Sequence, residues 1–479
     1  MSDTVREDRW KILPVVLLAP FMGCLDGSIV NVALPTMAKD LGAGLDGVQW
    51  TVSIYLMVVS ALVLVLVFGK VADLIGKTRV FLWGFVVFGS GSLLCALAWS
   101  LPVLISARAF QAIGAAMYMS SNQGIIASIF PPKERGRALG LMGTTVAIGT
   151  MIGPPLGGIM VELFGWPSLF LVNIPVSLFA FIVGSAKLPR EERRSSLAGF
   201  DLAGALLFAL FIFGLFFFLL DGQGSGWSAP AELSSLVVAA LCGLLFLTRE
   251  RRVVDPMIDL SIFRSGLFSV SVLCVLLVFC ASFCVNIVQP FYLQDVLGLS
   301  PAMAGLVLLA SPLMSGVIAP LSGYLADHVG GESLTVLGLL VELAALVGMS
   351  FLGANSSPFL AATFLGLFGL GQGVFSSPNT KLIMTHAPQS KLGIAGSINA
   401  LARNMGMVSG IAFAVSILYG VMSVRLGRKV SGFVPGASEA FVFGMRAAFL
   451  AAAGIIAIAI GLTVVRASRS RISSANASA

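Results

Sequence analysis

Charge is scarce in this 479-residue sequence: Asp, Glu, Lys and Arg together make up only 11% of it. Soluble domains carry about 25% charged residues, so the chain lacks the polar surface that a water-soluble enzyme needs. Only two histidines occur, and all six cysteines lie inside apolar stretches, so neither a metal site nor a disulfide framework is expected. The sequence also lacks a phosphate-cradling loop and a cluster of catalytic side chains, which argues against an ATP-driven pump and against an enzyme. We therefore expect no metal and no cofactor.

Long apolar runs are what the sequence has instead, and hydrophobic residues make up 57% of it. A helix that crosses a bilayer needs roughly 20 apolar residues, whereas a strand of a membrane barrel needs about 10 with alternating character. The fourteen apolar stretches lie at about 12–34, 48–68, 80–98, 102–127, 138–161, 168–187, 202–220, 231–248, 267–289, 302–323, 334–353, 357–378, 394–418 and 441–465. Their lengths predict fourteen transmembrane helices, and hence an all-α membrane protein.

The basic residues predict the orientation of these helices. If both termini lie in the cytoplasm, the inner segments hold 22 of the 29 Lys and Arg residues and the outer loops hold 4. Inner loops of membrane proteins are enriched in Lys and Arg, so we expect both termini to be cytoplasmic. The net charge of +7 then reflects this orientation, and no nucleic-acid partner is expected.

Two parts of the sequence resemble each other at a nearly constant spacing. Asn31 recurs as Asn286 at a shift of 255, and Gly114 recurs as Gly371 at a shift of 257. Two parallel halves of this kind are a transporter architecture. The predicted parts are a six-helix half at 1–187, two inserted transmembrane helices at 188–266 and a second six-helix half at 267–479.

Four motifs follow one another along the first half. They are Leu25-Asp26-Gly27-Ser28-Ile29-Val30-Asn31-Val32-Ala33-Leu34-Pro35, Gly69-Lys70-Val71-Ala72-Asp73-Leu74-Ile75-Gly76-Lys77-Thr78-Arg79, the set Arg108, Gln111 and Gly114, and Gly149-x3-Gly153-Pro154-x2-Gly157-Gly158. Together they resemble the signatures of the major facilitator superfamily, in its fourteen-helix drug–proton antiporter branch (EmrB/QacA-type). The resemblance covers nearly the whole chain and implies the major facilitator fold, with two six-helix halves plus two inserted helices.

This resemblance implies a proton-coupled antiporter that exports amphipathic drugs or related small molecules by alternating access. The proton gradient would drive it without a cofactor. A lipid, glycolipid or metabolite exporter of the same fold stays open as the alternative. The expected partners are an amphipathic small molecule or a lipid, protons and the lipid bilayer, and a periplasmic adaptor is compatible with this branch. The expected location is the cell inner (cytoplasmic) membrane, crossed many times.

Asp26 and Arg108 are the expected proton-coupling pair. Asp26 lies eight residues, roughly 12 Å, from the outer end of its span, and Arg108 lies six residues, roughly 9 Å, from the outer end of its own. Ionisable groups at such depth are costly and usually functional. Both helices line the central cavity in the resembled fold, so movement of Arg108 would switch Asp26 between loading and releasing a proton. A static ion pair is the alternative. The second half has Ala281 and Leu365 at the equivalent positions.

Two further sets of residues are candidates for substrate contact and for gating. The neutral polar side chains expected to line a substrate cavity are Asn31, Gln111, Asn286, Gln289 and Gln372. The residues expected to act in gating are Asp73, Lys77, Arg79, Gly149, Gly153, Pro154, Gly157 and Gly158. The glycines permit close helix approach and the proline removes a backbone hydrogen bond, although ordinary small-residue packing is the alternative for this segment. Glu342 lies in a span that the resembled fold places at the periphery, so it is not expected to face the cavity.

Overall fold

The computed structural model describes residues 9–64, 68, 71–72, 75–189, 201–253, 258–388 and 391–478, and every regular element in these ranges is a helix. Thirteen helical segments among them are long and apolar enough to cross a membrane. The expected span at 48–68 is represented by α4 (Trp50–Leu64), which is a shorter apolar helix. The prediction of an all-α membrane fold is therefore confirmed.

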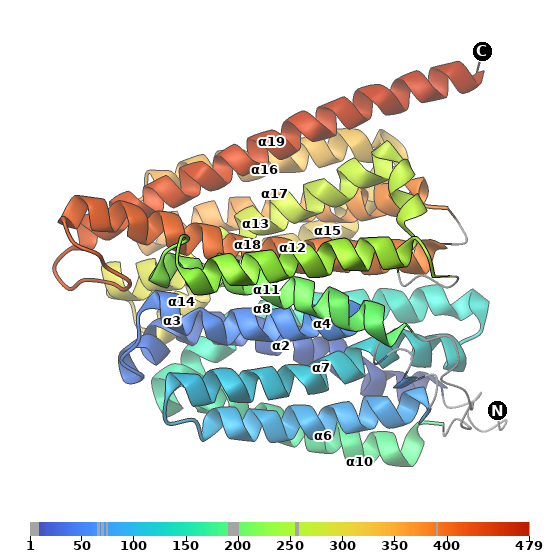
Figure 1. Cartoon of the computed structure of the whole chain (residues 1–479), viewed down its shortest axis with the longest axis horizontal. Helices are drawn as coiled ribbons and strands as arrows, with labels where there is room; N and C mark the ends of the chain where they lie inside the picture. The colour runs from blue at the N-terminus through green and yellow to red at the C-terminus, as the bar shows by residue number, and fades with distance from the viewer. Residues whose placement is uncertain are drawn as a thin grey trace. The chain divides into compact units, whose positions relative to one another are not determined.

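The helices, which Figure 1 labels, group into two compact units. The first contains α2 (Arg9–Asp40), α4, α6 (Lys77–Ala96), α7 (Leu101–Ile129), α8 (Pro132–Phe164), α9 (Ser168–Leu171), α10 (Asn173–Lys187), α11 (Leu202–Ser225) as far as Phe218, and α12 (Pro230–Glu250). The second contains η1 (Leu260–Arg264), α13 (Gly266–Phe291), η2 (Tyr292–Val296), α14 (Pro301–Leu308), α15 (Ala310–Val329), α16 (Gly331–Ser350), α17 (Pro358–His386), α18 (Leu392–Leu426) and α19 (Ser438–Ser478). The single turn α3 (Leu45–Val48) joins α2 to α4. The two predicted inserted helices thus group largely with the first unit, and the three-part division of the chain stays a prediction.

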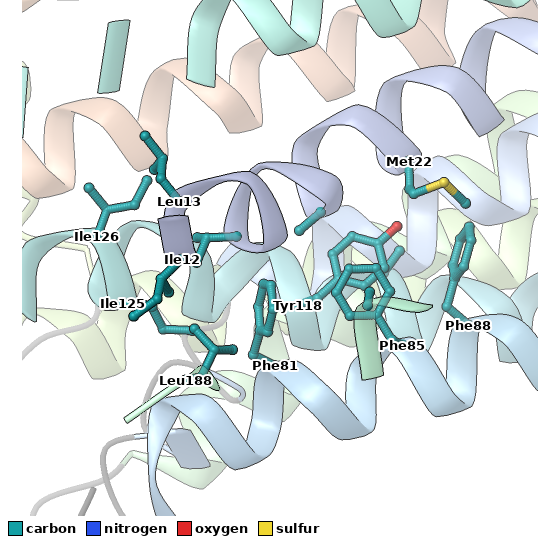
Figure 2. Close-up of a cluster of buried hydrophobic side chains, with 14 of the residues drawn as sticks. Ile12, Leu13, Met22, Phe81, Phe85, Phe88, Tyr118, Ile125, Ile126 and Leu188 are labelled. Atoms are coloured by element: carbon teal, nitrogen blue, oxygen red, sulfur yellow. The ribbon is translucent and has the colours of Figure 1, made fainter. Parts of the chain in front are cut away.

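An aromatic core joins α6 to α7 in the first unit. Phe81, Phe85 and Phe88 lie on one face of α6 because they are three or four residues apart, and all three are fully buried (Figure 2). The ring of Tyr118 on α7 stacks on Phe85 with centroids 4.9 Å apart and meets the edge of Phe88 at 5.4 Å. This packing holds in place the helix that carries Arg108 and Gln111.

The glycines of α8 pack against α2. A Cβ atom added to Gly149 would lie 2.8 Å from the carbonyl oxygen of Phe21, and one added to Gly157 would lie 2.8 Å from that of Ile29. Only glycine fits such an approach, because any side chain would push the two backbones apart. The glycine face predicted from the sequence is therefore present, and its partner is the helix that carries Asp26.

The middle of the same motif is equally close to α2. A Cβ atom on Gly153 would collide with the side chain of Ser28, whose hydroxyl donates to the carbonyl oxygen of Gly149 over 3.4 Å. Pro154 and Gly158 are buried, and α8 continues through both to Phe164. The role of these residues in gating stays a prediction.

The second unit repeats this helix crossing. Gly406 and Gly410 of α18 are the equivalents, at a shift of 257, of two glycines of α8. A Cβ atom on Gly406 would lie 3.0 Å from that of Phe279 on α13, and one on Gly410 would collide with the carbonyl oxygen of Cys280. The internal repeat is therefore visible in the packing as well as in the sequence.

Replacing Gly410 by alanine should destabilise the protein. The added methyl group meets backbone rather than a movable side chain, and overpacking of this kind costs about 1–3 kcal/mol. Gly420→Ala is the matched control, because the same helix leaves open space around Gly420. We expect the thermal unfolding midpoint in detergent to fall for Gly410→Ala and to stay at or above wild type for Gly420→Ala. Equal midpoints would contradict the proposed crossing.

Candidate functional site

The two ionisable residues expected deep in the first half form an ion pair. Nη1 of Arg108, on α7, donates to Oδ2 of Asp26, on α2, over 2.6 Å. The exposed fractions of the two side chains are 1% and 0%. Taking two charges out of water costs several kcal/mol for each, and only a close pair with further hydrogen bonds offsets that cost. The surroundings of the pair supply such bonds.

Two amides complete the contacts of the Asp26 carboxylate. Oδ1 of Asp26 accepts from Nε2 of Gln111 and from Nδ2 of Asn173, each over 3.0 Å. Gln111 lies one turn after Arg108 on the same face of α7, and its Oε1 accepts from Arg108 Nη1 over 2.6 Å. Its Nε2 also donates to the hydroxyl of Ser92 on α6 over 2.7 Å. Gln111 was expected in a substrate cavity, but here it supports the ion pair.

The guanidinium of Arg108 is held from two further sides. Its Nε donates to the carbonyl oxygen of Thr51, just inside α4, over 3.0 Å. Its central carbon lies 4.5 Å from the ring centroid of Tyr55 and 5.5 Å from that of Phe170 on α9. A cation over aromatic faces gains roughly 2 kcal/mol when water is excluded. Helices α2, α4, α6, α7, α9 and α10 therefore all contribute to one site inside the first unit.

This arrangement can exist in two states. Protonation of Asp26 would remove the negative charge opposite Arg108, while Thr51, Gln111 and the two rings would still hold the guanidinium. Oδ1 of Asn173 has no hydrogen-bond partner among the described residues. Since the two ends of an amide can exchange by a half turn, Asn173 can offer a donor to the carboxylate and an acceptor to the carboxylic acid.

The expected cavity residues of the second unit separate into two groups. Nε2 of Gln372 donates to the hydroxyl of Ser282 over 2.8 Å, and Nδ2 of Asn286 donates to the carbonyl oxygen of the same serine over 3.0 Å. Gln289 points elsewhere, with its Nε2 3.5 Å from the sulfur of Met349 on α16. Asn31 is buried on α2 in the first unit. The structure thus brings Asn286 and Gln372 together, but not Gln289 with them.

The predicted inner gate is only partly visible. Asp73 lies outside the described residues. Lys77 begins α6 and lays its side chain over Gly124 of α7, where an added Cβ would lie 2.9 Å from its Cδ. Arg79 is exposed in the first turn of the same helix. In the second unit Asp327, the equivalent of Asp73, forms an ion pair with Lys381 of α17.

A second ion pair of that unit is fixed outside the membrane spans. Lys391, just before α18, pairs with Asp259 and donates to the Ser261 hydroxyl over 2.6 Å. The bond from Lys391, followed by those from Ser261, lowers the pKa of Asp259 from its ordinary value to about 2. The Asp259 carboxylate is therefore charged throughout the physiological range.

Sequence reasoning missed a buried arginine that joins four helices. Arg466 of α19 is one of the 22 bases that the sequence places in the inner segments, and its side chain is fully buried. Its Nε donates to Glu332 on α16 over 2.8 Å, and its Nη1 donates to Ser271 on α13 over 2.8 Å and to Asn379 on α17 over 2.7 Å. A base at the end of a span normally extends to water, so only the packing of α19 reveals this role.

These features define a helical membrane transporter, and comparisons with known proteins place it in a family. A model described as Major Facilitator Superfamily matches residues 16–411 and again residues 271–478. The two matches begin at 16 and 271, which differ by 255, the shift of the internal repeat. The chain belongs to this superfamily.

Relatives and a solved structure agree with that placement. The riboflavin transporter RibZ of Clostridioides difficile is 36% identical over 96% of this chain and 97% of its own length. The multidrug resistance protein Stp of Mycobacterium tuberculosis is 33% identical over 89% of this chain and 80% of its own length. The crystal structure of the peptide transporter POT in complex with sulfate matches with a TM-score of 0.68 over 95% of both chains at 16% identity, which supports the fold alone.

Removing the charge of Arg108 alone should destabilise the protein more than removing both charges of the buried pair. Arg108→Gln leaves an uncompensated buried carboxylate, and such changes cost about 3–5 kcal/mol. In the double variant Asp26→Asn with Arg108→Gln no buried charge remains. We expect the thermal unfolding midpoint in detergent to fall strongly for Arg108→Gln and to recover partly in the double variant.

The matched control removes an exposed ion pair. Lys381 and Asp327 are 50% and 57% exposed, so Lys381→Gln should change the stability by less than about 1 kcal/mol. A wild-type midpoint for Arg108→Gln would show that the Asp26–Arg108 pair contributes nothing to the fold.

Proposed function

We propose that this chain is a proton-coupled antiporter of the fourteen-helix drug-exporting branch, and that it exports amphipathic small molecules by alternating access. The supporting observation is the sealed pair of Asp26 and Arg108. A carboxyl group inside a membrane span can take up one proton, and the loss of its charge removes the ionic attraction between Asp26 and Arg108. The relationship to the multidrug resistance protein Stp supports an export function.

The proposed cycle assigns a task to each part of the site. Asp26 takes up a proton when the site opens to the side of high proton concentration. Arg108 then moves within the cage of Thr51, Gln111 and the aromatic rings. The glycine face of α8 transmits this change, because α8 touches α2 on both sides of Asp26 along the helix. Proton release on the other side restores the ion pair. No cofactor takes part, and the chain acts as a carrier rather than as an enzyme in the inner membrane.

A second candidate substrate is a flavin. RibZ covers nearly the whole chain, and its name assigns it riboflavin transport. Riboflavin is uncharged, with a flat aromatic ring and a hydroxylated chain. Asn286, Ser282 and Gln372 of the second unit form a neutral polar cluster with matching donors and acceptors. Export of a lipid, glycolipid or other metabolite by the same fold is the further alternative.

Neutralising Asp26 should abolish active export without unfolding the protein. Asn173 and Gln111 can still hydrogen-bond the amide of Asp26→Asn, but this variant has no carboxyl group to carry a proton. In everted vesicles with an imposed proton gradient, ethidium-driven proton release should fall to the level of vesicles that lack the protein. The control is Glu439→Gln, since Glu439 is exposed in the first turn of α19. Undiminished proton release by Asp26→Asn would refute the coupling role.

Purified protein in proteoliposomes should transport ethidium and be inhibited by other bulky amphipathic compounds. Parallel assays with riboflavin, a fluorescent phospholipid and a sugar separate the alternatives. Gln372→Leu, which removes one donor of the polar cluster, should weaken riboflavin transport more than ethidium transport. Transport of riboflavin alone would support the flavin exporter. Transport of the lipid or the sugar alone would support the lipid, glycolipid or metabolite exporter.

A further inference from the structure

A second acidic side chain lies deep within the helices of the second unit. Glu342 is near the middle of α16, and its exposed fraction is 0%. Neither carboxyl oxygen has a hydrogen-bond partner among the described residues. Asp26 differs in that three side chains donate to it. Asp26 and Glu342 are both fully buried, yet they lie in opposite electrostatic surroundings.

Glu342 lies at a close glycine contact between α16 and α17. A Cβ atom on Gly338 would lie 2.7 Å from the carbonyl oxygen of Gly371 and 2.7 Å from the backbone nitrogen of Phe375. One on Gly371 would lie 2.7 Å from both Cγ and the backbone nitrogen of Glu342. The carboxyl group is thus sealed by a glycine contact between two helix backbones.

The first unit contains the same crossing without an acid. Gly84 on α6 and Gly114 on α7 approach in the same way, and a Cβ atom on Gly114 would lie 2.8 Å from Cα of Phe88. Phe88 is the equivalent of Glu342 at a shift of 254, and it is a fully buried aromatic residue. The crossing therefore needs no carboxyl group for its packing, and Glu342 requires another explanation.

No charged neighbour compensates Glu342 within the described part of the second unit. The helices packed against α16 are α15, α17 and α19. The titratable or charged residues of these three helices are Tyr324, Asp327 and His328 on α15, Lys381 and His386 on α17, and Glu439, Arg446, Arg466, Arg469 and Arg471 on α19. Besides Glu342, α16 itself has Glu332. Arg446 donates to Ser350 at one end of α16, and Arg466 pairs with Glu332 at the other. Lys381 forms an ion pair with Asp327.

An ionised carboxylate in such a place costs several kcal/mol, because neither water nor a donor reaches it. The neutral acid avoids most of that cost. We propose that Glu342 is a second proton-binding site of this transporter, loaded when α16 and α17 are closed against each other and emptied to water when their crossing opens. This inference rests on the proposed proton-coupled function and deepens it, since one transport cycle would then move a proton through each unit.

Infrared spectroscopy tests the site without any substrate. The carbonyl stretching band of a protonated carboxylic acid should be present in the wild-type protein, absent in Glu342→Gln and retained in both Asp26→Asn and Glu439→Gln. In D₂O the band should shift in the folded protein, because opening of the crossing exchanges the proton. No difference between wild type and Glu342→Gln would show an ionised group, and a band that shifts only on unfolding would show a permanently sealed acid. Either result overturns the proposal.

A transport measurement separates this inference from the proposed function. In proteoliposomes with ethidium, the ratio of protons to substrate should fall by one in Glu342→Gln, and also in Glu342→Phe, which restores the aromatic residue of the first unit. Asp26→Asn should lose coupled transport altogether. An unchanged ratio in both Glu342 variants, with coupling lost in Asp26→Asn, would overturn the second site alone. Full coupling in Asp26→Asn would refute the proposed function while the infrared result still decides the state of Glu342.

Discussion

The Asp26–Arg108 ion pair is the interaction around which the first unit is arranged. Two charges removed from water are tolerated only when they pair closely and make further hydrogen bonds. That requirement explains why Gln111 and Asn173 turn toward Oδ1, why Thr51 offers its carbonyl oxygen, and why aromatic rings close the remaining sides. If Asp26 takes up a proton, as proposed, Arg108 is left as the only charged member of a site that otherwise encloses an ion pair.

The glycines of α8 link this chemistry to backbone movement. Glycine contacts at Gly149, Gly153 and Gly157 let α8 lie directly on the stretch of α2 that contains Asp26. Close-packed interfaces move between discrete arrangements rather than deforming continuously. A shift of α8 would therefore displace the acid relative to Arg108, and protonation of the acid would in turn favour the shifted arrangement. This reciprocity is what a proton-driven transporter requires.

The spans, the repeat and the depth of the acid–base pair follow from the sequence, because they depend on hydropathy and on spacing along single helices. Asn173, Tyr55 and Phe170 do not follow from it. Each lies in an apolar stretch where nothing in the sequence indicates that its side chain faces Arg108, since that depends on how each helix is rotated about its axis. The burial of Arg466 does not follow from the sequence for the same reason: a base at the end of a span extends to water unless other helices enclose it. The contacts between side chains on different helices are therefore known only from the structure.

The two units share their helix crossings but differ in the side chains around them. Glycine fixes the contact of α6 with α7 and that of α16 with α17, while the neighbouring side chain is Phe88 in one and Glu342 in the other. At one end of these crossings the base lies on a different helix in each unit: Lys77 and Gly124 of the first unit correspond to Gly331 and Lys381 of the second. Because the glycine contacts determine how these helices pack, the residues beside them can differ between the two units. A carboxyl group at such a position meets no packing requirement, so its presence in a sealed, apolar site is best explained by function.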